Sequence, residues 1–459
     1  MNVSTGMTRP LVFLSLLSLF SLLHSCRPDE ADLPTARNLA MNESARVPMA
    51  WMDLFLDIDR YCYNFRPGPS PRVLAYTNLA AYEAVVQGMP SYQSLSHLYP
   101  GLALPAPVAE ESYHWPTVVN AVYANLFQKM IPGHIMDDLQ RTTLQFRILG
   151  LEQGLYDEFV NLTGRRTQNL SKEYGNAVAE AFWTWSMTDS YGHDGVNRPR
   201  PADYVPPAGP GMWQPTPPDF GAALFPYWGK ARSFVLAQED KLSRPPVTFS
   251  EDPGSSFYAQ ALEVRNIVEN LDFTNQWIAE FWSDDYIGLT FSPPARWLSI
   301  TTQVLEREGS SLEMALYTYA KVSVSLNDAA VACWHSKYTY NLERPVTYIN
   351  RVMDPDWAPH WDSSPSFPAF PSGHSTFGAA AAEVLSHIFG YNYAMTDASH
   401  GERDDFYGMP RTFDTFYEMA EENAYSRIPL GVHFRMDAEE GVRLGFAVGR
   451  KVNQMPFKK

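Results

Sequence analysis

The last third of the sequence reads KYTYNLERP at residues 337–345, PSGH at 371–374 and SRIPLGVH at 426–433. Together these segments carry three cationic side chains, two histidines and a glycine-bearing turn. Ammonium and guanidinium groups, and free amides at the start of a helix, bind tetrahedral oxyanions. We therefore expect the three segments to fold around one oxyanion site, in a scaffold of helices joined by turns.

The first segment follows a long apolar stretch of helical periodicity, residues 311–337, which Lys337 closes. Arg344 precedes Pro345, and a residue before proline is disfavoured in the α region, so the helix is predicted to end near Arg344. A seven-residue offset is about two helical turns, which puts the two side chains on a similar face. There the ammonium acts as a point charge and the guanidinium as a fork for two oxygens. Taken alone, the pair also fits a solvated helix end.

The second segment is a turn that leads into a run of small residues, STFGAAAA at 375–382. Free N–H groups and the helix dipole at the start of this predicted helix make a seat for an anion. Gly373 lets the backbone come close, and Ser372 adds a hydroxyl. Ser372 fits almost as well as an ordinary N-cap. His374, directly behind these residues, favours the functional interpretation.

In the third segment, Arg427 and His433 are separated by a loop that contains Pro429 and Gly431. Such a loop can turn both side chains toward one point. Asp437 follows His433 by about one helical turn and is expected to accept the other N–H of its ring, which would fix the tautomer. A lone histidine here is more often structural, but together with the other two segments it indicates a shared site.

Apolar residues recur with helical spacing along most of the chain, and strand-like alternation is scarce. The predicted fold class is therefore all-α, a helical bundle. Helices are expected at residues 71–85, 117–129, 135–151, 172–187, 257–271, 294–308, 311–337, 375–389, 413–424 and 437–452. The exception is the stretch 198–228, whose closely spaced prolines forbid helix and whose aromatic residues predict an ordered surface loop.

The bulk properties fit an ordinary globular protein, with 459 residues, 45% hydrophobic and 19% charged. A formal net charge of −16 leaves no basic stripe for nucleic acid. Residues 11–23 form an apolar run that is too short to span a bilayer and typical of a signal peptide. The LHSC that follows at 23–26 resembles a bacterial lipobox, so Cys26 is predicted to be acylated. His24 is unusual in that position, which leaves plain secretion as the alternative.

The predicted parts of the chain are a lipoprotein-type signal peptide at 1–25, an N-terminal helical layer with the Pro-rich loop at 26–254, and a site-bearing bundle at 255–459. No later segment is apolar over sufficient length to span a bilayer, so membrane contact is expected only through a lipid anchor at Cys26. The protein is then a cell-envelope lipoprotein of the periplasm or outer membrane, or else it is secreted. Export permits a disulfide between Cys62 and Cys333, but the apolar helical surroundings of Cys333 favour a buried thiol.

In order and spacing, the three segments resemble the motifs of the vanadium-dependent haloperoxidases, in particular the bacterial iodoperoxidase-like members. Those enzymes belong to the type 2 phosphatidic acid phosphatase superfamily. The resemblance implies an all-α bundle of that type and vanadate as the cofactor, with phosphate able to occupy the same site. The residues that it implies for binding the vanadate oxygens are Lys337, Arg344, Ser372, Gly373 and Arg427. It makes His433 the single protein ligand to the metal and His374 the acid–base catalyst.

Three further positions extend the resemblance. Trp334 and Phe367 stand where chloroperoxidase-like members carry aromatic residues beside the vanadate, so they are predicted to line the substrate pocket. Asp285, in the segment FWSDD, resembles the carboxylate that supports the acid–base histidine. Lys337 is implied in catalysis as well as in binding, because its ammonium would polarise a peroxide oxygen.

The implied activity is Lewis-acid rather than redox catalysis, in which vanadate activates hydrogen peroxide and a halide attacks it to give a hypohalous species. Iodide is the expected halide, followed by bromide, while an organic acceptor and a homo-oligomeric state are left open. The first alternative is a soluble acid phosphatase that forms a phosphohistidine at His433, with His374 as general acid. The second is an envelope lipoprotein that binds an oxyanion without turnover, and the two histidines argue against it.

Overall fold

The computed structural model describes residues 39–62, 65–131, 137–361, 364–407 and 409–459. The predicted signal peptide at 1–25 and the acylation site at Cys26 lie outside the described residues, so export and the lipid anchor stay predictions. In the part of the chain that the structure describes, no helix is both long and apolar enough to cross a membrane.

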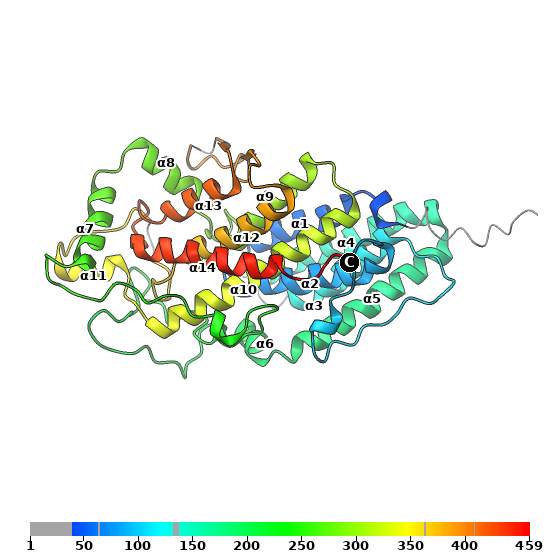
Figure 1. The fold of residues 1–459 in the computed structure, drawn as a ribbon, viewed down its shortest axis with the longest axis horizontal. Coiled ribbons are helices and arrows are strands. Elements are labelled where there is room, and N and C mark those ends of the chain that lie inside the picture. The colour runs from blue at the N-terminus through cyan, green and yellow to red at the C-terminus, as the bar shows by residue number, and fades with distance from the viewer. Residues whose placement is uncertain (1–38, 63–64, 132–136, 362–363, 408) are drawn as a thin grey trace, which may run out of the picture. The chain divides into compact units, whose positions relative to one another are not determined.

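The described residues confirm the all-α fold class (Figure 1). The first part of the chain forms α1 Arg46–Asp59, α2 Pro69–Val85, α3 Trp115–Met130, α4 Asp138–Thr163, α5 Arg165–Met187 and α6 Ser190–Asn197. The second part forms α7 Ser256–Glu269, α8 Phe273–Phe281, α9 Pro293–Arg307, α10 Leu312–Tyr340, α11 Pro345–Val352, α12 Gly373–Phe389, α13 Phe416–Tyr425 and α14 Arg435–Asn453. A short antiparallel pair joins β1 Met395–Asp397 to β2 Arg411–Phe413.

All ten helices expected from periodicity are present, because their apolar stripes find partners in the bundle. Periodicity does not predict α1, α6, α8 or α11. Helices α6, α8 and α11 have only 8 or 9 residues, too few for a periodic pattern to stand out. Helix α1 carries Pro48 in its first turn, where proline is tolerated although it masks a helical pattern.

The end of α10 corrects the expected geometry of the first motif. The helix ends at Tyr340, and Asn341 takes a left-handed conformation with φ 49° that turns the chain. Arg344 is therefore not part of α10 but caps the start of α11. The prediction that Lys337 and Arg344 share one helix face is wrong. The turn at Asn341, rather than helical periodicity, brings the two side chains to the same place.

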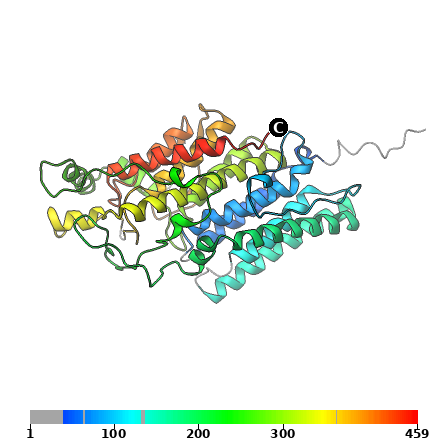
Figure 2. The ribbon, with the colours of Figure 1, turned by 60° about the horizontal axis from the view of Figure 1, so that its bottom comes forward.

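Helix α10 forms the centre of the bundle, and nearly all of its residues up to Lys337 are buried. Helices α2 and α12 both pack against it. Helices α3 and α5 lie beyond α2, whereas α13 and α14 lie against α12, so the helices form successive layers (Figure 2). The predicted division between 26–254 and 255–459 stays a prediction, and helices from both sides of it pack against each other.

Close contact between α12 and α14 holds two of the motifs together. Glycines face α12 at four-residue spacing along α14, at Gly441, Gly445 and Gly449. A Cβ at Gly445 would lie 2.3 Å from the carbonyl oxygen of Thr376, so only glycine fits there. At the other end of the contact, the Ser372 N–H donates to the Asp437 carbonyl at 2.9 Å. The start of α12, which carries the second motif, and the start of α14, which directly follows the third motif, are therefore fixed relative to each other.

The Pro-rich loop at 198–228 contains no α-helix or strand, as predicted. Its backbone is bonded to the segments between the motifs. The N–H of the buried Trp213 donates to Asn341 O at 2.7 Å, and the Leu224 N–H donates to Ser366 O at 2.9 Å. The loop is thus an ordered part of the structure that surrounds the site.

Cys62 and Cys333 are both buried and carry free thiols. The interpretation of Cys333 as a buried thiol in an apolar helix is confirmed. Burial raises the pKa of both thiols, which keeps them protonated and unreactive.

Candidate active site

The three motif segments meet at a cavity of about 260 Å³. Most of the predicted site residues line it, namely Asp285, Trp334, Phe367, Gly373, His374, Arg427 and His433. The side chains of Lys337, Arg344 and Ser372 are completely buried. The structure therefore brings together residues from α10, α12, the N-cap of α11 and the connection between α13 and α14.

Backbone carbonyls of residues 367–369 hold the two cations of the first motif. Lys337 Nζ donates to two of these carbonyls, both at 2.8 Å. Arg344 Nε donates to the third at 2.9 Å, and its Nη1 donates to Val432 O at 2.8 Å. Carbonyls satisfy these donors without pairing them with a carboxylate, so the positive charge of the ammonium and guanidinium forms is left for a ligand.

Arg344 keeps one donor unused. Its Nη2 is buried and has no hydrogen-bond partner among the described residues. A buried donor without a partner is destabilising unless a ligand satisfies it. Nη1 of the same guanidinium lies 3.3 Å from His433 Nε2. The Arg344 guanidinium therefore contacts the His433 ring through Nη1 and has Nη2 left for a ligand. This arrangement fits an oxyanion bound beside the His433 ring.

His433 is oriented by Asp437, as the sequence predicts. His433 Nδ1 lies 3.0 Å from Asp437 Oδ2, and the Phe434 N–H donates to the same oxygen at 3.0 Å. When Nδ1–H donates to the carboxylate, Nε2 is left with its lone pair. This arrangement suits a histidine that serves as a metal ligand or as a nucleophile.

His374 is held by Arg427 and by α13. Arg427 Nη1 donates to His374 Nε2 at 3.0 Å, and its Nη2 donates to the Trp282 carbonyl. The His374 carbonyl accepts from Asn423 Nδ2 at 3.2 Å. The ring is thus fixed at the cavity wall by one of the cations that would bind the anion.

Burial and the nearby cations lower the pKa of both histidines. Burial is the larger cause in each ring, followed by Arg427 for His374 and by Arg344 for His433. Burial also lowers the pKa of Lys337. Both imidazoles are therefore neutral near neutral pH, as a metal ligand or a general base must be. A bound anion would offset the cations and raise these pKa values.

Ser372 and Gly373 form the start of α12. Ser372 is the N-cap, and its Oγ accepts from the Ser375 N–H at 3.4 Å, so the N-cap interpretation is correct and the anion-binding role stays a prediction. A Cβ on Gly373 would lie 3.7 Å from both Phe377 and Trp334, whose rings line the cavity. A side chain at Gly373 would therefore take up space beside the anion seat.

The predicted substrate pocket lies against the cations. The ring centroids of Trp334 and Phe367 are 5.1 Å apart. Lys337 Nζ and Arg344 Cζ lie 5.1 and 5.0 Å from the centroid of Phe367. Aromatic faces attract cations and keep water away from them, so the field of these cations acts strongly on an anion in the cavity.

Asp285 lines the cavity, but its contacts differ from the predicted ones. Its carboxylate pairs with Arg66, with Nε and Oδ1 3.1 Å apart, and the His374 ring is bonded by Arg427 instead. The Asp285 backbone is left-handed, with φ 90°, which is rare for a residue other than glycine. Burial raises the pKa of Asp285 to about 6, and Arg66 opposes that shift. Its catalytic role stays a prediction.

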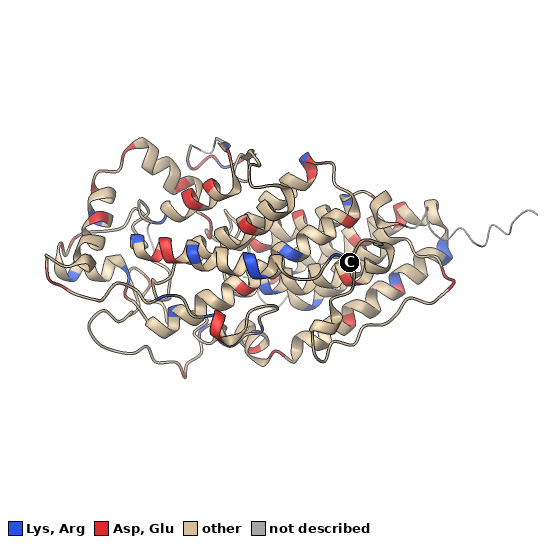
Figure 3. Ribbon diagram, in the orientation of Figure 1, with Lys and Arg blue, Asp and Glu red and all other residues tan. Residues whose placement is uncertain are grey.

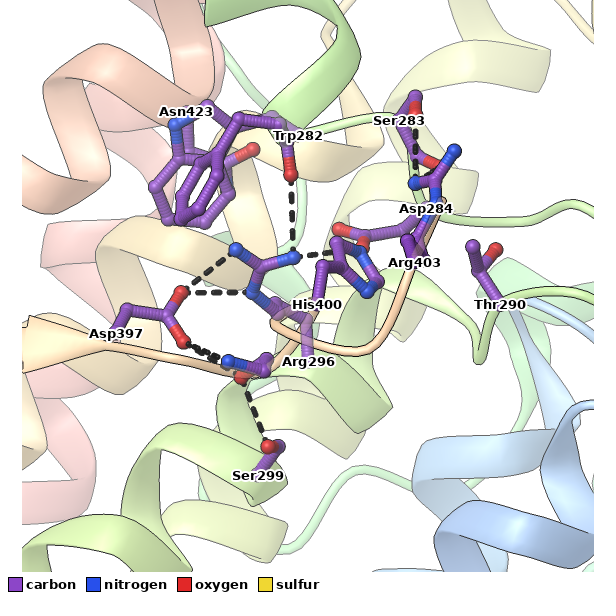
Figure 4. Close-up of polar contacts among 12 residues, drawn as sticks. Trp282, Ser283, Asp284, Thr290, Arg296, Ser299, Asp397, His400, Arg403 and Asn423 are labelled. Atoms are coloured by element: carbon purple, nitrogen blue, oxygen red, sulfur yellow. Dashed lines mark hydrogen bonds and ion pairs between the residues drawn. The ribbon is translucent and has the colours of Figure 1, made fainter. Parts of the chain in front are cut away.

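A buried ion-pair network that no sequence pattern predicts supports the cavity wall (Figure 4). Arg296 of α9 pairs with Asp284 at 3.2 Å and with Asp397 at 2.7 Å. His400 Nε2 lies 2.8 Å from Asp284 Oδ1. Burial alone would raise the pKa of Asp284, but Arg296 and His400 outweigh it and lower that pKa. Arg296 lies in an ordinary amphipathic helical stretch, and no local pattern in the sequence links it to Asp284 or Asp397.

The segment that carries the three motifs matches a known protein family, and the chain matches two known proteins over part of its length. A family model described as the VCPO second helical-bundle domain matches residues 317–355 and 350–458. A vanadium chloroperoxidase from Curvularia inaequalis is 25% identical over 278 residues, 46% of this chain and 46% of that protein. A vanadium-dependent bromoperoxidase from Ascophyllum nodosum is 33% identical over 93 residues, 18% of this chain and 17% of that protein. The matched segments thus span less than half the length of either relative.

A solved structure extends the match to nearly the whole chain. The crystal structure described as the first bacterial vanadium-dependent iodoperoxidase is 30% identical, and the alignment covers 90% of this chain and 97% of that chain with a TM-score of 0.78. The chain belongs to the vanadium-dependent haloperoxidase family. Membership in the haloperoxidase family confirms the resemblance carried by the three motifs, and it agrees with their meeting at one cavity.

Proposed function

We propose that the protein is a vanadate-dependent haloperoxidase that uses hydrogen peroxide to oxidise halide, iodide first and then bromide. The observation that carries the proposal is a neutral, Asp437-oriented His433 beside a buried Arg344 donor that has no partner among the described residues. Family membership supports the general reaction. The 30% identical iodoperoxidase structure supports iodide as the first halide.

The donors at the cavity fit vanadate. Its oxygens would be bound by Lys337, Arg344, Ser372, Gly373 and Arg427. His433 Nε2, which keeps its lone pair when Nδ1–H donates to Asp437, would coordinate the metal in place of its 3.3 Å contact with Arg344 Nη1. Vanadate, when bound, supplies a Lewis-acid centre that activates hydrogen peroxide toward a halide. Phosphate is a similar tetrahedral anion and fits the same donors.

His374 is the group on this chain that is placed to move a proton. Burial and Arg427 hold its pKa low, so the ring is neutral and can accept a proton from hydrogen peroxide and return it to the departing oxygen. The overall reaction consumes peroxide, halide and one proton, and it releases hypohalous acid and water. Trp334 and Phe367 give a large, polarisable halide an apolar wall beside the cations.

An acid phosphatase would use the same donors. His433 would then attack phosphorus and form a phosphohistidine, and His374 would protonate the leaving alcohol. The aromatic wall of Trp334 and Phe367 suits a halide better than a polar leaving group, which favours the peroxidase. A binding protein without turnover would need the cations but neither histidine.

The experiment compares halide oxidation with phosphate-ester hydrolysis in the purified protein. Hydrogen-peroxide-dependent oxidation of iodide and bromide is measured with and without orthovanadate, and p-nitrophenyl phosphate hydrolysis is measured without it. We expect vanadate-dependent oxidation of iodide, with bromide slower. His433→Ala should reduce this to background, whereas His387→Ala, an exposed change farther along α12, should leave it unchanged.

The other outcomes separate the alternatives. Ester hydrolysis that vanadate inhibits, without halide oxidation, would move the assignment to the phosphatase. Vanadate binding without either turnover, with equal affinity in His374→Ala, would indicate a binding protein.

A further inference from the structure

One wall of the cavity comes from the Pro-rich loop, far before the three motifs in the sequence. Arg200 lies on this wall together with Leu224. Arg427, the other arginine that lines the cavity, is buried, whereas Arg200 is exposed. Arg200 therefore stands where the cavity meets solvent, and Arg427 stands inside it.

The loop folds around the Arg200 guanidinium and fixes its position. Nη1 donates to the Ala222 carbonyl of the same loop. A Cβ at Gly221 would lie 2.7 Å from Ser366 Oγ and 3.2 Å from Arg200 Nη1, so the hydroxyl and the guanidinium lie around one point. Ser366 also lines the cavity. A guanidinium has five N–H donors, so the bond to Ala222 leaves donors for an anion.

The charges around Arg200 make it a candidate for attracting anions. The chain has a net charge of −16, and acidic and basic residues are interspersed along its helices (Figure 3). The cavity-lining Asp284 and Asp285 are each paired with a buried arginine. No carboxylate pairs with Arg200 in the described part of the chain, whereas Arg198, two residues earlier, pairs with Asp203 at 3.2 Å.

We propose that Arg200 recruits the halide anion at the mouth of the cavity, an inference that rests on the proposed function. The guanidinium, with the Ser366 hydroxyl beside it, raises the local halide concentration before the ion passes to the aromatic wall. Hydrogen peroxide is neutral and gains nothing from this charge. Arg200 therefore acts on halide capture and not on the chemical step.

The experiment is a steady-state comparison of Arg200→Gln with wild type, using iodide and the vanadate-loaded protein. The KM for iodide should rise about threefold, the effect of one exposed charge at close range. kcat and the KM for hydrogen peroxide should stay unchanged. Rim charges also set salt dependence, so kcat/KM for iodide should fall less steeply with ionic strength in the variant.

Two further variants separate charge at this position from charge in general. Arg200→Lys should keep most of the iodide affinity. Arg198→Gln removes the same charge from the same loop at a side chain that is paired and does not line this cavity, and it should behave as wild type. Thermal unfolding of each variant checks that the loop stays folded.

Three results would overturn the inference. The first is an equal KM for iodide in Arg200→Gln and wild type. The second is a KM for peroxide that rises together with the KM for iodide. The third is a KM for iodide that rises as much in Arg198→Gln as in Arg200→Gln. A wild-type protein without vanadate-dependent halide oxidation would instead refute the proposed function, and the role of Arg200 in halide capture with it.

Discussion

The contact between His433 and Asp437 predicts how tightly vanadate binds, and Asp437→Asn tests it. In the native structure, Asp437 Oδ2 accepts from both His433 Nδ1 and the Phe434 N–H, each at 3.0 Å. Asparagine has a single acceptor oxygen and carries no charge. That oxygen, placed where Oδ2 stands, can still accept both bonds, but the neutral amide lacks the carboxylate charge that makes His433 a better ligand.

The expected loss of vanadate affinity follows from the role of residues that hydrogen-bond to a metal-binding histidine. Loss of a residue that orients a metal-binding histidine weakens metal affinity by about 10- to 100-fold, which is about 1.4 to 2.8 kcal/mol. The variant also removes the negative charge next to the buried Lys337 and Arg344. The free energy of unfolding should therefore fall as well, by about 1 to 3 kcal/mol.

The assay is isothermal titration of orthovanadate into wild type, Asp437→Asn and Glu439→Gln. Glu439 lies on the same helix but is exposed, so its variant controls for the loss of one acidic charge on α14. The Kd should rise in Asp437→Asn and stay unchanged in Glu439→Gln. An unchanged Kd in a folded Asp437→Asn would refute the reasoning, because vanadate would then bind without using the oriented His433.

Two more predictions concern charge and packing. Burial lowers the pKa of Lys337, so its ammonium, the form that attracts an anion, is present below that pKa and lost as pH rises through it. Vanadate affinity should therefore decline between about pH 6 and 9, and Lys337→Gln should bind more weakly and lack that step when Kd is titrated against pH. Gly445→Ala places a Cβ 2.3 Å from Thr376 O and should lower the free energy of unfolding by about 1 to 3 kcal/mol. Gly150→Ala on α4, where nothing lies within 4 Å, should instead raise it by up to about 1 kcal/mol, and denaturant unfolding of both variants checks the contrast.

The sequence was sufficient to predict which residues meet at the cavity wherever chemistry and local spacing agree. Lys337, Arg427 and His433 stand out because cations and histidines recur in three ordered motifs, and Asp437 follows because one helical turn brings it under His433. The position of Arg344 could not be read in this way. It depends on a left-handed Asn341, and asparagine takes that conformation in only some contexts.

Long-range pairs lie beyond what the sequence can show. Asp285 pairs with Arg66, which is 219 residues away in the chain, and no local pattern links the two. Arg296 sits in an ordinary helical stretch, and its partner Asp397 lies in a strand of three residues. Such contacts depend on the packing of whole helices, which periodicity does not specify.

Because one wall of the cavity comes from the Pro-rich loop, related proteins can differ in this wall while they share the three motifs. The family model that matches this chain covers residues 317–458, which carry the three motifs but not the loop. A relative that kept the three motifs and replaced the loop would keep its anion-binding chemistry behind a different entrance. Grouping relatives by their motifs therefore sorts them by the anion that they are built to bind, whereas grouping them by the segment equivalent to 198–228 would sort them by which molecules can enter the cavity.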